Sequence, residues 1–467
     1  MENKLEKRYG LFIAICMVVG IVIGSGAFVK SQDILNYTNY DVKIGIFAWV
    51  LGGIVMIGCT LQFAVFAKKH SRVNGVIDYT EVIVGTKYAY FLGSFMTNVY
   101  YPAMTAVLGW VCARFTLELF NYYNVVSFLT LVVSIIYILA IYFINVLAPK
   151  ISGKLQISTT VIKLIPICLV AIVGTIAGLI NGNMREAFVL MSGKSDIKTV
   201  FPAICACAFA YEGWIIATSI NSELKNSKKN LPLAIVIGSI MIILIYIVFF
   251  IGQFGATSLL DYVSSANGDR LANVAVTKLF GNVGGTLLKV FIIVSCIGTL
   301  NGLMVATTRA RYSLAIRRQG LKKEEFSKVH PKYNMPVNSS IYGLIMIIIW
   351  FLYFFYGTLQ NKLWIFNFDS SELPIITVYA FYIPLFVKYM INEFKETKKK
   401  SKLILPIFAI CCSLFMIFCA IYAHGIVPYK ANKSLPILWY FVIFGLVMLG
   451  SYLENKNKFK DYYIIEE

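Results

Sequence analysis

The first apolar segment of the chain contains three glycines, at positions 20, 24 and 26, in the stretch GIVIGSGAF. The apolar run begins at Leu11 and is long enough for a membrane helix, yet glycine is a poor helix former. Gly24 and Gly26 flank Ser25, so the spacing favours unwound backbone there. Unwound backbone at bilayer depth is tolerated only where it lines a cavity that protein encloses. The stretch therefore predicts a binding site inside the membrane.

A second unusual segment covers residues 201–214 and reads FPAICACAFAYEGW. Glu212 and Gly213 lie in the middle of otherwise apolar residues, where a charged carboxylate costs about 2.5 to 3.5 kcal/mol on membrane-insertion scales. The carboxylate could meet a substrate ammonium, take up a proton, or tie a broken helix to its neighbour. Two interrupted helices, each the first of a five-helix set, are the pattern of an inverted-repeat transporter with its site near the bilayer midplane.

Unwinding at both places would expose main-chain groups of opposite polarity. Free N–H groups at the start of the second half of the first helix would suit a carboxylate, and Ser25 would add a hydroxyl donor. Free carbonyls at Val22, and at Phe209 and Ala210, would suit an ammonium. An α-amino acid carries both charges, so the two breaks together predict an amino acid site. The alternative is that the glycines only let neighbouring helices pack closely.

The elements that must position these residues are membrane helices. Of the 467 residues, 58% are hydrophobic and 14% charged, and the mean hydropathy is +0.74. A soluble domain carries about 25% charged residues, so this composition predicts an all-α integral membrane protein. The first apolar segment lacks a small-residue cleavage site, and we expect it to be a span and not a cleaved signal.

Apolar segments of membrane-spanning length, roughly 20 residues each, can be placed about twelve times. Their approximate bounds are 11–35, 43–67, 88–120, 126–147, 155–180, 200–221, 231–254, 283–313, 337–357, 362–390, 403–424 and 434–454. We expect the first ten to form a five-plus-five inverted repeat with broken first and sixth helices, and the last two to be additions. The repeats would cover residues 1–182 and 183–392, and residues 393–467 would hold the additional helices and a cytoplasmic tail.

The net charge of +19 is explained by membrane topology. With a cytoplasmic N-terminus, about 29 of the 42 Lys and Arg residues lie inside and about 10 outside, as membrane orientation by positive loops requires. Both termini are then expected in the cytoplasm of a multi-pass protein of the cell membrane, in contact with lipid. The positive charge therefore gives no reason to expect a nucleic-acid partner.

No metal or cofactor site is expected from the sequence. The ten cysteines lie in apolar stretches without metal-type spacing, which favours small core residues. His70, His330 and His424 lie near segment ends and form no ligand cluster along the chain. Clustered nucleophile or acid–base motifs, which a membrane-embedded enzyme would need, are also missing, so we expect no enzyme activity.

Other ionisable residues in the apolar segments allow weaker inferences. Asp369, Glu372 and Pro374 fall at the start of the tenth segment, where acids could favour polar or cationic substrate side chains or could line the extracellular vestibule. Arg114 and Glu118 lie about one helical turn apart and predict an ion pair.

Several stretches resemble the amino acid, polyamine and organocation transporter superfamily, in particular its L-type amino acid transporter branch. Residues 20–28 resemble the first-helix signature, and residues 209–214, 223–226 and 230–235 resemble the sixth-helix signature of that branch. Residues 295–302, followed by Arg309, are similar to its eighth helix. The likeness covers the first ten segments in order and implies a leucine-transporter-like fold.

The resemblance also implies roles for single residues. It assigns binding of the substrate carboxylate to Ser25 and Gly26, and binding of the ammonium to Val22, Phe209 and the position of Glu212. It makes Phe209 the aromatic that closes over bound substrate, whereas the residue alone could be plain core. A heavy-chain cysteine, expected after the third helix in animal members, is absent around residues 121–124, so we expect no disulfide-linked heavy chain.

Lys163 lies in the fifth segment with apolar residues on both sides. Sodium-coupled proteins of the implied fold hold a cation between helices 1, 5 and 8, and a resident ammonium would replace it. Bonded to carbonyls near Gly20 and to a hydroxyl of Ser295 or Thr299, Lys163 would make the protein independent of sodium. The alternative is a structural lysine that snorkels to an interface.

The sequence thus predicts a sodium-independent transporter, an exchanger that moves L-amino acids across the plasma membrane by alternating access. A proton-coupled symporter, with Glu212 or Lys163 titrating, is the alternative within the class. A membrane-embedded amino acid sensor is the alternative outside it, and the tail after Leu453 is short for the signalling domain that a sensor carries.

Overall fold

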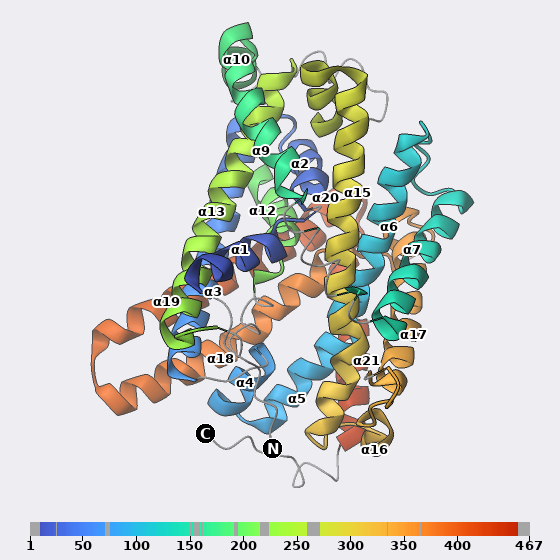
Figure 1. Ribbon diagram of the computed structural model, residues 1–467. Coiled ribbons are helices and arrows are strands. Elements are labelled where there is room, and N and C mark those ends of the chain that lie inside the picture. The colour runs from blue at the N-terminus through green and yellow to red at the C-terminus, as the bar shows by residue number, and fades with distance from the viewer. Residues whose placement is uncertain are drawn as a thin grey trace.

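The computed structural model describes residues 10–24, 26–70, 75–148, 151–152, 159, 162–190, 195–214, 224–258, 271–333, 335–363 and 366–455. The elements named within these ranges are all helical. Figure 1 shows them as a bundle of long helices, with the short helix α1 (Leu11–Val22) near half its height. The predicted all-α class is confirmed.

Nine helical segments in the described part of the chain are long and apolar enough to cross a membrane. They are α3 (Val42–Lys69), α7 (Phe128–Leu147), α9 to α10 (Leu164–Asn181), α13 (Ser227–Ala256), α15 (Leu271–Ile316), α17 with η6 (Val337–Leu359), α18 (Leu373–Thr397), the run from η8 through α19 and η9 to α20 (Lys400–Asn432), and α21 (Pro436–Asn455). Each overlaps a predicted span. The protein is therefore a multi-pass membrane protein.

Two shorter apolar helices lie where the sequence predicts broken spans. The first predicted span is divided into α1, which ends at Val22, and α2 (Gly26–Tyr37). The sixth begins with α12 (Val200–Ala210), which ends at Ala210 and is followed by a turn to Trp214. The continuation of this span, residues 215–223, lies outside the described ranges.

The third predicted span is built from three helical pieces end to end. They are α5 (Thr86–Phe95), the π-helical turn η1 (Met96–Tyr100) and α6 (Tyr101–Leu119). The predicted ion pair near its end is confirmed, because Nε of Arg114 lies 2.8 Å from Oε1 of Glu118.

Two predicted boundaries are wrong for local reasons. The tenth helix begins at Leu373 and not near residue 362, because Oδ1 of Asp369 accepts from the N–H groups of Ser371 and Glu372, and Pro374 occupies the first helical turn. The acidic residues therefore precede this helix. The eighth begins at Leu271 and not near residue 283, because the helical run continues through a kink at Gly281, whose φ of 71° suits glycine.

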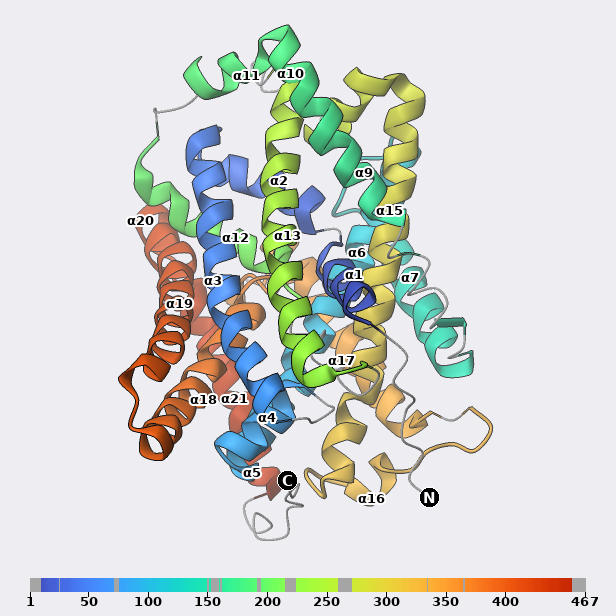
Figure 2. The ribbon, with the colours of Figure 1, turned by 60° about the vertical axis from the view of Figure 1, so that its left-hand side comes forward.

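Long helices surround the interrupted ones. Figure 2 shows α13 running beside α3, and α13 also packs against α1. On the other side α15 packs against α6 and α17. Consequently α13 supports α1, whereas α12 is held mainly between α2 and α3.

Candidate functional site

The break in the first span lies where the glycines predict it. α1 ends at Val22, and Ile23 is extended, with φ −69° and ψ 106°. α2 begins at Gly26, and the described residues between the two helices, Ile23 and Gly24, are not helical. Ser25 lies outside the described residues, and its role as a hydroxyl donor to substrate stays a prediction.

Both remaining glycines of the break are in close contact with other elements. A Cβ on Gly26 would lie 2.7 Å from Cα of Ala210, and a Cβ on Gly24 would lie 2.6 Å from Oγ1 of Thr299. Real Cβ atoms essentially never approach so closely, so a side chain at either position would force its neighbours apart. The glycines therefore let the start of α2 lie directly on the end of α12, and let the break lie directly on α15.

The carbonyl ends of α1 and α12 converge on one side chain. The Tyr246 hydroxyl of α13 lies 3.2 Å from the Val22 carbonyl oxygen and 3.1 Å from that of Ala210. A hydroxyl carries one proton and each carbonyl oxygen has two lone pairs, so acceptor capacity remains at both helix ends. Two negative helix ends that share one neutral donor make a place that suits a cation. Tyr246 was not among the residues that the sequence pointed to.

Glu212 is bound to a neighbouring helix. It lies two residues after the end of α12, and the Tyr100 hydroxyl donates a hydrogen bond to its carboxylate. Tyr100 closes the π-helical turn of the third span, and Gly213 takes a positive φ of 108° in the turn after α12. Of the three roles open for Glu212, the tie between a broken helix and its neighbour is the one that this contact supports.

Phe209 lies next to a buried charge. Nζ of Lys30, on α2, lies 5.3 Å from the centroid of the Phe209 ring, within cation–π range. The same Nζ lies 2.6 Å from Oε1 of Glu372 and 3.4 Å from Oδ2 of Asp33. Lys30 and Glu372 are both buried. Glu372 is therefore paired inside the protein, which neither sequence interpretation of this residue anticipated.

Lys163 is buried without the bonds expected for it. Its Nζ has no hydrogen-bond partner among the residues that the structure describes, and the same holds for Oγ of Ser295. The Thr299 hydroxyl instead donates to the Ser295 carbonyl at 3.2 Å. The helix that begins next to Lys163, α9 (Leu164–Leu169), packs against α15. Contact between the fifth and eighth spans is thus present as expected, whereas Nζ of Lys163 makes no direct bond to Ser295, Thr299 or the carbonyls near Gly20 in the described part of the chain.

The expectation that His424 belongs to no ligand cluster is wrong. Its Nε2 lies 3.2 Å from Oε2 of Glu372 and 3.7 Å from Sγ of Cys205, and all three residues are buried. Sequence spacing could not predict this group, because its members come from α12, from the residue before α18, and from η9 (Tyr422–Ile426).

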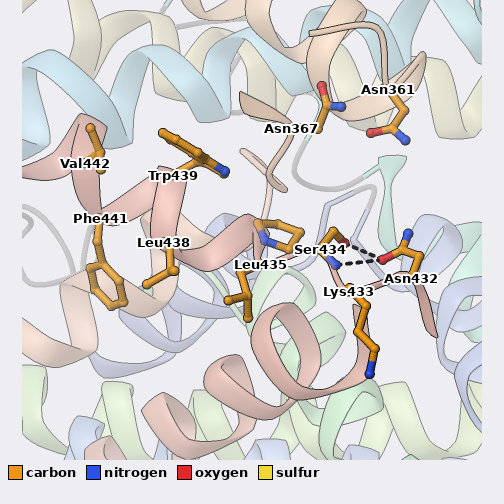
Figure 3. Close-up of a pocket in the computed structure, with 11 residues that line it drawn as sticks. Asn361, Asn367, Asn432, Lys433, Ser434, Leu435, Leu438, Trp439, Phe441 and Val442 are labelled. Carbon is orange, nitrogen blue, oxygen red and sulfur yellow. Dashed lines mark hydrogen bonds between the residues drawn. The ribbon is translucent and has the colours of Figure 1, made fainter. Parts of the chain in front are cut away.

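A separate pocket of about 910 Å³ lies between α21 and the segments before it. Figure 3 shows its lining: Asn361 and Asn367 lie on one side, Leu438 and Trp439 of α21 on another, and Ser434 is bonded to Asn432. None of its lining residues belongs to the helix breaks. The pocket is therefore not part of the candidate site.

Two curated relatives resemble the chain over most of its length. The serine/threonine exchanger SteT of Bacillus subtilis (strain 168) is 31% identical over 422 residues, which cover 89% of this chain and 91% of the relative. The cystine/glutamate transporter of Homo sapiens is 25% identical over 457 residues, which cover 94% of this chain and 86% of the relative.

One solved structure shows the same arrangement of helices. The crystal structure of MhsT in complex with L-phenylalanine matches with a TM-score of 0.59 at 13% identity, and the match covers 90% of this chain and 99% of that chain. At this identity the likeness concerns the fold alone. The family model for amino acid permeases matches residues 9–449, nearly the whole sequence. The chain therefore belongs to the amino acid permease family and to its L-type amino acid transporter branch.

Proposed function

We propose that this amino acid permease is a sodium-independent exchanger that holds an L-amino acid between the break in its first helix and the end of α12, and moves it by alternating access. The observation that carries the proposal is the convergence of the Val22 and Ala210 carbonyls on the hydroxyl of Tyr246. Such a convergence supports recognition of the substrate ammonium by main chain, which leaves the substrate side chain free to vary.

The carboxylate end of the substrate is assigned to the start of α2. Gly26 is the first residue of that helix, and the first N–H groups of a helix have no partner within it. These groups and the positive helix end suit an anion, and Ser25 would add its hydroxyl. Gly24 keeps this end close to α15 because a side chain there would collide with Thr299.

Phe209 and Glu212 are proposed to control the two halves of the transport cycle. Phe209 would close over the substrate, and its ring is held by Lys30 of the same helix that binds the carboxylate. Glu212 would keep the end of α12 attached to the third span through Tyr100. Rocking of α1, α2 and α12 against the longer helices would then open one side of the site and close the other.

Sodium independence rests on Lys163. An isolated buried ammonium is costly, and Nζ of Lys163 has no hydrogen-bond partner among the described residues. We infer that this ammonium takes the place of a bound cation. Lys163 would stabilise the break through carbonyls near Gly20 in one state of the cycle. Proton-coupled symport, with Glu212 or Lys163 titrating, is the competing mechanism.

The proposal includes the full topology. The nine spans, the divided first span, the span that begins with α12 and the span from α5 to α6 add up to the twelve helices predicted from the sequence. We assign the two repeats to residues 1–182 and 183–392, both termini to the cytoplasm, and no disulfide-linked heavy chain. The excess of Lys and Arg in alternate loops supports this orientation.

Counterflow in proteoliposomes tests the function. The relative that is a serine/threonine exchanger makes serine and threonine the first substrates to try. We expect labelled serine to accumulate only in vesicles preloaded with amino acid, at the same rate when choline replaces sodium. Uptake into empty vesicles driven by an imposed pH gradient would support symport instead, and a strict need for sodium would contradict the proposal.

A glycine substitution tests the site itself. Gly26→Ala should reduce counterflow at least tenfold, because its Cβ would collide with the backbone of Ala210. Gly445→Ala in α21 is the matched control, since a Cβ there meets nothing within 4 Å. Equal counterflow by both variants, at equal amounts of protein in the vesicles, would contradict a site between α2 and α12.

A further inference from the structure

We propose that Cys205, Glu372 and His424 form a binding site for a divalent transition-metal ion, with Zn²⁺ as the reference ion. One potential ligand atom from each residue lies within 4.8 Å of the others, and all three residues are buried. A thiolate, an imidazole and a carboxylate are the ligand types that Zn²⁺ takes in proteins.

Two of the three spacings between the ligand atoms fit a tetrahedral ion. Metal–ligand distances of about 2.3 Å for sulfur and about 2.1 Å for nitrogen and oxygen give tetrahedral edges of about 3.6 Å between sulfur and nitrogen and about 3.4 Å between nitrogen and oxygen. The observed distances are 3.7 Å from Sγ of Cys205 to Nε2 of His424 and 3.2 Å from that Nε2 to Oε2 of Glu372. An ion would therefore need little movement of these two edges, and the fourth position of the tetrahedron would stay open.

Lys30 prepares the carboxylate for this role. Its Nζ holds Oε1 of Glu372 at 2.6 Å, which leaves Oε2 directed at His424. Hydrogen bonds of this kind to the second atom of a ligand orient it and raise metal affinity. The charges also match, because a thiolate and a carboxylate supply the two negative charges that a divalent ion needs, while Lys30 has Asp33 as a further counter-ion.

A group held only by hydrogen bonds is the competing explanation. His424 could bridge Glu372 and Cys205 without an ion, and serine could replace cysteine in that arrangement because its hydroxyl also donates and accepts. Metal binding requires the thiolate and releases its proton. The two explanations therefore differ in what they predict for Cys205→Ser.

An ion bound at this position would affect transport, an inference that rests on the proposed function. Cys205 lies on α12, five residues before its end at Ala210, whereas Glu372 and His424 belong to the start of α18 and to η9. A bound ion would fasten α12 to two other helices. If α12 moves during the cycle, Zn²⁺ should inhibit exchange.

Cobalt spectroscopy on the purified full-length protein tests the site without reference to transport. Co²⁺ should produce a thiolate-to-cobalt charge-transfer band and intense tetrahedral d–d bands, and Zn²⁺ should displace both. Cys205→Ser should abolish the charge-transfer band, and His424→Asn should weaken Zn²⁺ binding at least tenfold. Cys207→Ser is the matched control: Cys207 is equally buried on α12 but packs against Gly52 of α3.

Three results would overturn the site: no thiolate band with Co²⁺, a band that survives in Cys205→Ser, or a band that is lost in Cys207→Ser. Counterflow then tests the consequence, and Zn²⁺ should inhibit the native protein but not Cys205→Ser. Binding without inhibition would overturn the inhibitory role. An intact cobalt band in a protein that shows no counterflow would instead count against the proposed function, so the two failures can be told apart.

Discussion

Two buried lysines, Lys30 on α2 and Lys163 in the fifth span, have different surroundings. Lys30 has an anion at 2.6 Å, a second at 3.4 Å and the ring of Phe209 below it. Lys163 has no hydrogen-bond partner for its ammonium in the described part of the chain. Both residues are almost fully removed from solvent, with 5% of Lys30 and none of Lys163 exposed.

The difference separates two uses of a buried charge. Separating the members of a buried ion pair leaves a buried charge without its counter-ion, which lowers the free energy of unfolding. The pair of Lys30 with Glu372 therefore fixes the position of α2 relative to the start of α18. An ammonium without a hydrogen-bond partner breaks no bond when it leaves this conformation, and it can form hydrogen bonds or an ion pair in another. We therefore regard Lys30 as holding the observed state together, and Lys163 as the group whose contacts change during transport.

The largest effect is expected for Glu372→Gln, which leaves the Lys30 ammonium buried without its closest counter-ion. The free energy of unfolding should fall by about 3 kcal/mol, with Asp33 limiting the loss. Denaturation of the purified protein in detergent measures it. Glu396→Gln is the control because that carboxylate pairs with Lys69 at the surface and should cost less than about 1 kcal/mol. Equal losses would remove the distinction between the two buried lysines.

Lys163→Met should have the opposite pattern. It removes a buried charge that has no hydrogen-bond partner among the residues the structure describes, so the free energy of unfolding should stay the same or rise, whereas counterflow should fall at least tenfold. Stability and counterflow are measured on the same preparation, with Lys388→Met as an exposed lysine control. A variant that is both less stable and equally active would show that Lys163 is a structural lysine like Lys30.

Much of this arrangement follows from short-range signals in the sequence. The break between Val22 and Gly26 was predictable because glycine weakens a helix locally. The interruption near Glu212 was predictable because a charged carboxylate inside an apolar membrane helix is costly in free energy. The ion pair of Arg114 with Glu118 follows from helical periodicity.

The partners of the site residues were not predictable, because they are distant in sequence. Lys30 and Glu372 are 342 residues apart, and Tyr246 is 224 residues from Val22. Tyr246 also lies in an apolar segment with several aromatic residues, where nothing local distinguishes a hydroxyl that binds main chain from one that faces lipid. The start of the tenth helix was misplaced for a related reason, since the cap formed by Asp369 is a property of the folded turn.

The smallest effect is expected for Tyr246→Phe, which removes a neutral hydroxyl and, unlike the substitutions of Glu372 and Lys163, no charge. Its hydroxyl is the hydrogen-bond donor found near both the Val22 and Ala210 carbonyls, so its loss should cost about 1 kcal/mol, or roughly fivefold in the substrate concentration that half-saturates counterflow. The maximal rate should change less, because Lys163 and the glycines of the break remain. Tyr356→Phe, at an exposed tyrosine of η6, controls for the substitution itself. If Tyr246→Phe instead bound substrate more tightly, the hydroxyl would be a competitor of the substrate ammonium for the two carbonyls and not the group that aligns them.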